Sequence, residues 1–114
     1  MQLRILKYLL DIESVITELE AIKIHAGNDF HVFSSQIVLQ RAAERGLEII
    51  GEAVRKLLEI SPDIGLSSAK KIIGLRNIIA HAYDSVEPEL IWAIIQRDIP
   101  RLQEEIVTLK NTLP

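Results

Sequence analysis

The chain of 114 residues contains no cysteine, which excludes disulfide scaffolds, thiol nucleophiles, iron–sulfur clusters and cysteine-ligated zinc sites. Aromatic residues make up only 4% of the sequence, so its core must be built from aliphatic side chains. The apolar N-terminal stretch is interrupted by Arg4, Lys7 and Asp11, whereas a signal-peptide core or a membrane span needs an unbroken apolar run. We therefore expect a cytoplasmic protein with no membrane partner.

The remaining composition suits one globular domain that covers residues 1–114. Hydrophobic residues account for 48% of the chain and charged residues for 25%. The formal net charge of −3 argues against a protein that coats nucleic acid over its whole surface, but it allows a local basic site. Basic residues are in slight excess in the middle of the chain, and Arg41, Lys70 and Lys71 are the candidates there for guiding RNA.

Aliphatic residues recur every three or four positions through almost the whole chain, which is the period of a buried helix face. The pattern predicts four main helices, over about 3–26, about 35–60, about 67–82 and from about Pro88 to the C-terminus. A connector over 29–35 joins the first two. We expect an all-α, antiparallel four-helix bundle, with five helices if the chain kinks and restarts at Asp98–Pro100.

Two glycines lie inside the second predicted helix, where each costs about 1 kcal/mol relative to alanine. These residues are Gly46 and Gly51. The expected compensation is a close contact with a neighbouring helix.

The third predicted helix carries polar side chains in a largely apolar segment, namely Arg76, Asn77 and His81. Burying a guanidinium costs several kcal/mol unless it is paired and hydrogen-bonded. Arg76 therefore requires a carboxylate from another helix, an open cleft or a subunit interface, and Glu48 and Glu52 are the nearest partners by type. Asn77 and His81 are four residues apart and share a helix face, so the amide could orient the imidazole.

This cluster suits chemistry on a phosphate without a metal or cofactor. In RNA the attacking group would be the neighbouring 2′-hydroxyl, and the product would be a 2′,3′-cyclic phosphate. His81 could serve as general base or acid, and Arg76 could hold the scissile phosphate. The alternative is a structural network in which both side chains are satisfied internally.

The segment Arg76–Tyr83 resembles the signature of the HEPN superfamily in its HepT-like branch, which reads Arg-Asn, three residues, His, one residue, Tyr. The Ile-Gly-Glu-Ala sequence at 50–53 and the Asp-Ile-Pro sequence at 98–100 also match that branch in order and spacing. The similarity extends over nearly the whole chain.

The resemblance implies a HEPN-like helical bundle that forms a homodimer, with the Arg and His motifs of two subunits lining one cleft. It further implies a metal-independent endoribonuclease toxin that is restrained by a minimal nucleotidyltransferase antitoxin. In this interpretation Arg76 and His81 are catalytic, Asn77 and Glu52 support the site, and Tyr83 accepts AMP from the partner. The competing hypothesis is a non-catalytic helical dimer that binds nucleotide or scaffolds a nucleotidyltransferase.

Overall fold

The computed structural model describes residues 2–81 and 86–113 and places nearly all of them in helices. The elements in chain order are α1 (Gln2–His25), α2 (Phe30–Ser35), α3 (Ile37–Ile60), α4 (Ala69–His81), α5 (Pro88–Ala93), a π-helical turn η1 (Ile94–Asp98) and α6 (Ile99–Thr112). The described ranges contain no strand. The all-α helical bundle predicted from the apolar period is confirmed.

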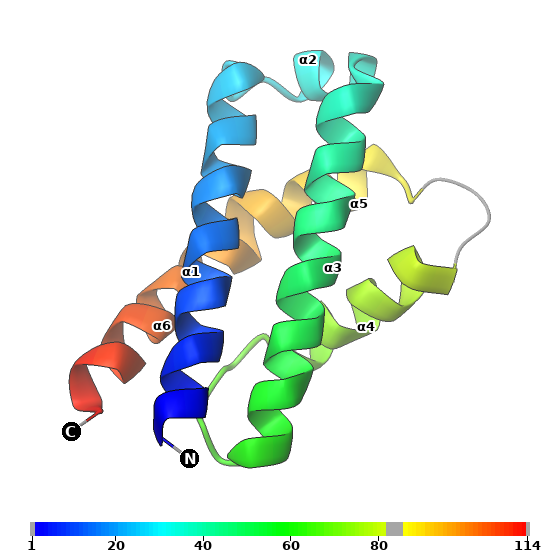
Figure 1. The fold of residues 1–114 in the computed structure, drawn as a ribbon. Coiled ribbons are helices and arrows are strands. Elements are labelled where there is room, and N and C mark those ends of the chain that lie inside the picture. Colours follow the sequence, from blue (N-terminus) through cyan, green and yellow to red (C-terminus); the bar gives the residue numbers. More distant parts are fainter. Residues whose placement is uncertain (1, 82–85, 114) are drawn as a thin grey trace.

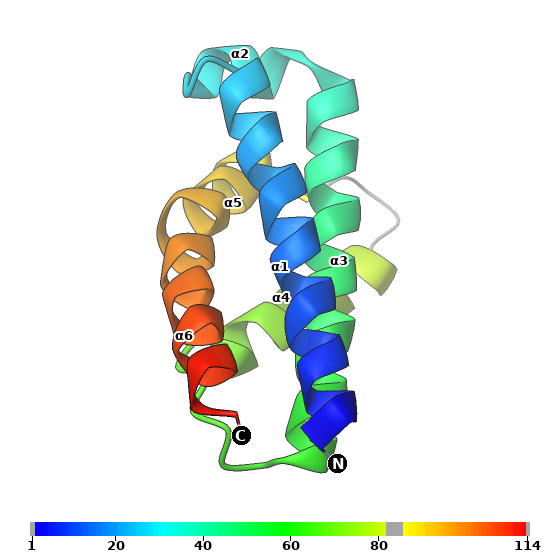
Figure 2. The same cartoon turned by 60° about the vertical axis from the view of Figure 1, so that its left-hand side comes forward.

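Helices α1 and α3 lie side by side and antiparallel, and they form the long axis of the molecule (Figures 1 and 2). Helix α4 crosses the second half of α3, whereas α5, η1 and α6 form a continuous arm that packs against α1. The core between them is aliphatic, and Phe33 is the only aromatic residue among its fully buried side chains in the described ranges. No helix within these ranges combines the length and apolar character that crossing a membrane requires.

The predicted connector over 29–35 is wrong in part, because it contains the short helix α2. Asp29 caps this helix: its carboxylate accepts a hydrogen bond from the backbone N–H of His31 at 2.8 Å. Phe33, on α2, then packs against Trp92 of α5, with ring centroids 5.0 Å apart. This short helix therefore closes one end of the bundle.

The predicted kink or restart at Asp98–Pro100 is confirmed in part: helix α6 begins at Ile99 with Pro100 in its first turn, but a π-helical turn joins it to α5 without a break in the helical backbone. Asp98 forms no side-chain cap, and the N–H of Ile99 donates to the carbonyl of Ile94, five residues earlier. A proline inside a regular α-helix lacks one N–H and its ring collides with the preceding turn. The wider π turn gives Pro100 the room it needs, so the helix continues.

Both helix-interior glycines lie at close helix contacts, as predicted. A Cβ atom at Gly46 would lie 3.0 Å from a methyl group of Leu19 on α1. A Cβ at Gly51 would lie 2.3 Å from the Cβ of Arg76 and 3.2 Å from the carbonyl oxygen of Ile72, both on α4. The missing side chain at Gly51 therefore sets how closely α4 approaches α3.

Candidate active site

Helix α4 is anchored to the bundle mainly through its first half. Ala69, Ile72 and Leu75 are buried against the core. The backbone N–H of Ser67, just before the helix, donates to the carboxylate of Glu105 on α6 at 3.1 Å. The second half of the helix is more open: Ile78 is 53% exposed, and Asn77 and His81 are exposed as well.

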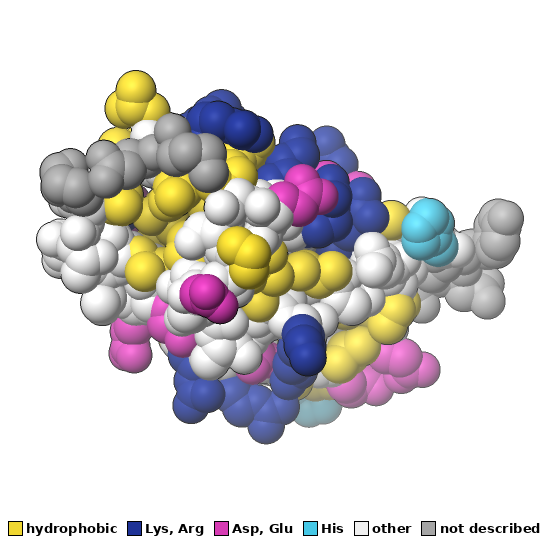
Figure 3. Space-filling view, turned by 90° about the horizontal axis from the view of Figure 1, so that it is seen from below, with side chains coloured by type: hydrophobic (Ala, Val, Ile, Leu, Met, Phe, Trp, Pro, Cys, Tyr) yellow, Lys and Arg dark blue, Asp and Glu magenta, His cyan; other side chains and the backbone are white. Residues whose placement is uncertain are grey.

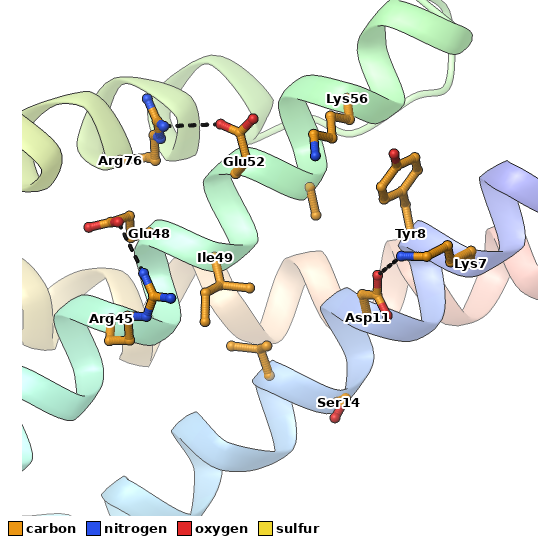
Figure 4. Close-up of a pocket in the computed structure, with 12 residues that line it drawn as sticks. Lys7, Tyr8, Asp11, Ser14, Arg45, Glu48, Ile49, Glu52, Lys56 and Arg76 are labelled. Atoms are coloured by element: carbon orange, nitrogen blue, oxygen red, sulfur yellow. Dashed lines mark hydrogen bonds and ion pairs between the residues drawn. The ribbon is translucent and has the colours of Figure 1, made fainter.

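Arg76 lies where α4 crosses α3, with its stem packed on Gly51 and its guanidinium turned toward a groove (Figure 4). Its Nη2 forms an ion pair with Glu52 Oε2 at 3.2 Å, and its Nη1 donates to Asn77 Oδ1 at 3.1 Å. Its Nε is buried and has no hydrogen-bond partner among the described residues. The side chain is 28% exposed, so the guanidinium is neither sealed in the core nor free in solvent.

Of the two carboxylates that the sequence offers as partners for Arg76, Glu48 and Glu52, it is Glu52 that pairs with the guanidinium. It is shared with Arg55 one turn along α3, whose Nη2 lies 2.6 Å from Glu52 Oε1. The hydrogen bond from Arg55, together with the positive charges of Arg55, Arg76 and Lys56, lowers the pKa of Glu52 despite a partial loss of hydration. Glu52 is therefore ionised near neutral pH. The other candidate, Glu48, pairs instead with Arg45 at 3.3 Å.

A groove of about 460 Å³ runs between α1 and α3 and ends at Arg76. Val15, Ile49 and Ala53 form an apolar floor, and charged side chains surround it. Tyr8 from α1 and Lys56 from α3 point into the same gap (Figure 4). Neither residue stands out in the sequence, because each looks like an ordinary surface position on its own helix and only the packing of the two helices joins them.

The other predicted site residues on and after α4 are His81, Asn77 and Tyr83. His81 lies five residues beyond Arg76, about 7.5 Å along the helix axis and about 140° around it. No hydrogen bond between described residues joins Asn77 to His81; the Asn77 side chain contacts Arg76 instead. Tyr83 lies outside the described residues.

The three candidate RNA-binding cations do not gather around Arg76. Lys71 pairs with Asp98 at 3.0 Å, on the side of α4 that faces the C-terminal arm. Lys70 is exposed at the start of α4, and Arg41 pairs with Glu44 at the far end of α3, about 15 Å along the axis from Gly51. On the face shown in Figure 3, Lys and Arg side chains form separate groups among acidic and apolar ones.

The arrangement can bind an anion by exchange. A phosphate that enters the groove can replace Glu52 on the guanidinium, which provides two parallel N–H donors. The described part of the chain, 2–81 and 86–113, contains no group of three or more His, Asp or Glu side chains placed to hold a metal ion.

Comparison with known proteins gives one family and several relatives. The model of the family described as ribonuclease HepT-like matches residues 5–109. "Putative RNase TTE0752" of Caldanaerobacter subterraneus subsp. tengcongensis is 36% identical over 97 residues, which cover 83% of this chain and 87% of that protein. "Putative RNase MJ1380" of Methanocaldococcus jannaschii is 34% identical over 82 residues, 68% of this chain and 72% of that protein.

This chain is also similar to part of a longer protein, whose name gives two activities. "Gamma-glutamylcyclotransferase and putative RNase MJ0434" of Methanocaldococcus jannaschii is 34% identical over 103 residues, which cover 90% of this chain but only 45% of that protein. No solved structure gives a significant match.

Proposed function

The chain belongs to the HepT-like ribonuclease family, and from this premise we propose that it is a metal-independent endoribonuclease that uses Arg76 and His81. The observation that carries the proposal is the position of Arg76. A guanidinium with two-point hydrogen-bonding capacity lies at the end of a groove, held by a carboxylate that a phosphate can replace.

In the proposed reaction the 2′-oxygen of a ribose attacks the adjacent phosphorus, and the bond from phosphorus to the 5′-oxygen breaks. The 2′-hydroxyl proton passes to a neutral imidazole, and an imidazolium returns a proton to the leaving 5′-oxygen. The products are a 2′,3′-cyclic phosphate and a 5′-hydroxyl end. Arg76 binds the non-bridging phosphate oxygens and stabilises the charge that grows on them.

Supporting residues would hold the guanidinium in place. Glu52 and Asn77 bind two different nitrogens of Arg76, which limits rotation of its planar group. Arg55 shares Glu52 and thereby fixes the carboxylate. Arg41, Lys70 and Lys71 would guide RNA toward the site from outside the groove.

We propose that the active form is a homodimer. In one subunit Arg76 and His81 are about 140° apart around the axis of α4, so the two side chains lie on different sides of the helix. Gly74 and Ile78 share the open face of α4 that also carries His81. Among the described residues, no atom beyond the neighbouring turns of α4 itself lies within 4 Å of a Cβ placed at Gly74, and Ile78 is 53% exposed. A second copy seated on this face would place the His81 side chains of two chains next to each other, while each Arg76 lies on the opposite side of its own α4 helix.

We also propose that the protein is a toxin and that a cognate minimal nucleotidyltransferase neutralises it. The Tyr83 hydroxyl would attack the α-phosphorus of ATP, releasing pyrophosphate and a proton and leaving AMP on the tyrosine oxygen. The added phosphodiester lies two residues from His81 in sequence, where its charge and bulk would compete with RNA.

The central test is cleavage of a labelled RNA by purified protein in the presence of EDTA. We expect cleavage with 2′,3′-cyclic phosphate ends, reduced at least about 100-fold in both Arg76→Ala and His81→Ala. Both variants must unfold at temperatures close to that of the wild type. A folded wild-type protein that binds a nucleotidyltransferase or nucleotide but cuts no RNA would favour the non-catalytic dimer instead.

Neutralisation is tested with Tyr83→Phe. This variant should arrest growth like the wild type when expressed alone, and it should escape its nucleotidyltransferase when the two are expressed together. Full silencing of the variant would indicate that the partner acts by binding alone.

A further inference from the structure

We propose that the α1–α3 groove is a nucleotide subsite, in which Tyr8 stacks on a base of the RNA and Lys56 binds the phosphate next to the scissile one. This inference rests on the proposed ribonuclease function, since it places a neighbour of the nucleotide held at Arg76. The proposal adds Tyr8 on α1 and Lys56 on α3 to the residues that bind RNA, and both lie outside the Arg–His motif.

The size and lining of the groove suit one nucleotide. Its volume of about 460 Å³ lies within the range of small-molecule pockets. The apolar floor of Val15, Ile49 and Ala53 can cover the flat face or edge of a base, while the charged rim faces the ribose and phosphate.

Tyr8 is the aromatic group that single-strand recognition requires. It is half-buried against the core, and it extends from α1 toward α3 across the groove (Figure 4). The ammonium groups of Lys7 and Lys56 lie over the face of its ring, 5.1 Å and 6.0 Å from the centre, so a stacking base would displace one of these flexible side chains toward the phosphate. An aromatic ring bordered by cations matches the chemistry of a nucleotide, in which a π face is joined to a phosphate.

Lys56 is the groove cation that is available to an incoming phosphate. Three other basic residues line the groove, and each already has a carboxylate partner: Lys7 pairs with Asp11 at 2.8 Å, Arg45 with Glu48 at 3.3 Å and Arg76 with Glu52 at 3.2 Å. Lys56 forms no ion pair with a described residue. A phosphate can therefore bind Lys56 without breaking an existing pair.

The groove is continuous with the proposed site of cleavage. Glu52 and Lys56 lie four residues apart on α3, about 6 Å along its axis, and Glu52 contacts Arg76. A strand with one phosphate at Arg76 can place the next near Lys56, with the base between them directed toward Tyr8.

The test measures binding separately from cleavage. The probe is a short single-stranded RNA of mixed sequence in which every ribose carries a 2′-O-methyl group, so that the attacking hydroxyl is absent; binding is followed by fluorescence anisotropy. We expect Tyr8→Leu and Lys56→Gln each to weaken binding at least about fivefold, because each removes a stacking or phosphate contact. Tyr8→Phe and Lys56→Arg keep the ring and the charge, and should stay within about twofold of the wild type.

The matched control is Arg101→Gln, which removes one positive charge from an exposed position of α6 outside the groove. It should change affinity by no more than about twofold. Leucine at position 8 keeps apolar contact with the core, and thermal unfolding verifies that each variant folds. If Tyr8→Leu fails to fold, the pair Lys56→Gln and Lys56→Arg still decides the question.

The outcomes separate the subsite from the nuclease. Binding that depends on Tyr8 and Lys56, in a protein that does not cut natural RNA, would keep the subsite and overturn the nuclease. Cleavage that survives while the groove variants bind like Arg101→Gln would keep the nuclease and overturn the subsite. A wild-type protein that neither binds the probe nor cuts RNA would overturn both.

Discussion

Single side chains determine how the guanidinium of Arg76 is held. Glu52 binds one nitrogen and Asn77 another, while the buried Nε has no partner among the described residues. A guanidinium with an unmet N–H and a replaceable carboxylate is only partly satisfied within the subunit.

Replacing Glu52 by alanine should separate positioning from binding. Without its carboxylate the guanidinium can rotate away from the productive orientation, so we expect kcat for RNA cleavage to fall about tenfold. KM should stay unchanged or decrease, because a negative charge that competes with the phosphate is removed. Steady-state kinetics on a fixed RNA substrate measure both values. A rise in KM at constant kcat would contradict a positioning role.

Glu52 also gives the fold a defined response to acid. Because hydrogen bonding by Arg55 and nearby positive charges lower its pKa in the folded chain, the ionised carboxylate stabilises the native state above its unfolded pKa. This contribution is lost as the pH falls through the lowered, folded-state pKa. Between neutral pH and about pH 3, the wild type should therefore lose more unfolding free energy than Glu52→Gln. Urea denaturation of both proteins across this pH range measures the free energy of unfolding. If that free energy falls equally with pH in the wild type and in Glu52→Gln, Glu52 does not contribute to the acid response.

At the scale of elements, a missing side chain on α3 positions α4. The Cβ of Arg76 and the carbonyl of Ile72 occupy the space that any side chain at Gly51 would need. The same turn of α3 carries Glu52, so one short stretch sets both the separation of the helices and the partner of Arg76.

Gly51→Ala should disturb both stability and cleavage. Alanine gains about 1 kcal/mol in helix propensity, but forcing the helices apart costs about 1–3 kcal/mol or more, so we expect net destabilisation by roughly 1–2 kcal/mol. Cleavage should fall at least about tenfold because Arg76 moves. Gly46→Ala is the control: it meets only side-chain atoms of Leu19 and Val15, which can shift, and it lies away from α4. Equal effects of the two variants on cleavage would contradict this role of Gly51.

The sequence predicted the long helices, because the aliphatic period is a local signal. The cost of burying an unpaired guanidinium pointed to Glu48 or Glu52 as partners of Arg76, but only the packing of α3 against α4 selects Glu52. Helix α2 was not expected, because its six residues are too few to show a period. Pro100 correctly indicates the first turn of α6, but the π turn before it was not predicted, because its backbone hydrogen bond has no sequence signature. The groove beside Tyr8 depends on the pairing of α1 with α3, which helix periodicity does not specify.

At the scale of the whole molecule, one subunit leaves aliphatic surface uncovered on α4. Ile78 is 53% exposed, and no described residue from another element fills the space over Gly74, one turn earlier on the same face. A second copy packed on this face would bury both positions and bring a second His81 next to the first.

Ile78→Glu should therefore convert a dimer into a monomer and abolish cleavage. The control is Val107→Glu, which places the same charge at an exposed aliphatic position of α6, 43% exposed in the subunit. Sedimentation velocity gives the oligomeric state, and circular dichroism verifies helical content. A wild-type protein that sediments as a monomer and still cuts RNA would refute the need for a second chain.

The crossing of α4 over α3 has a mechanical consequence. Helix α4 contacts Gly51 of α3 at Arg76. The five residues of α4 after Arg76 extend about 7.5 Å further along the helix axis and end at His81. A tilt of about 10° at the crossing leaves the arginine stem nearly still but shifts the tip by about 1.3 Å. Displacements of that size are large on the scale of proton transfer. In the proposed reaction, the position of the His81 imidazole thus depends on how firmly α4 is held against Gly51, about one and a half turns earlier in the helix.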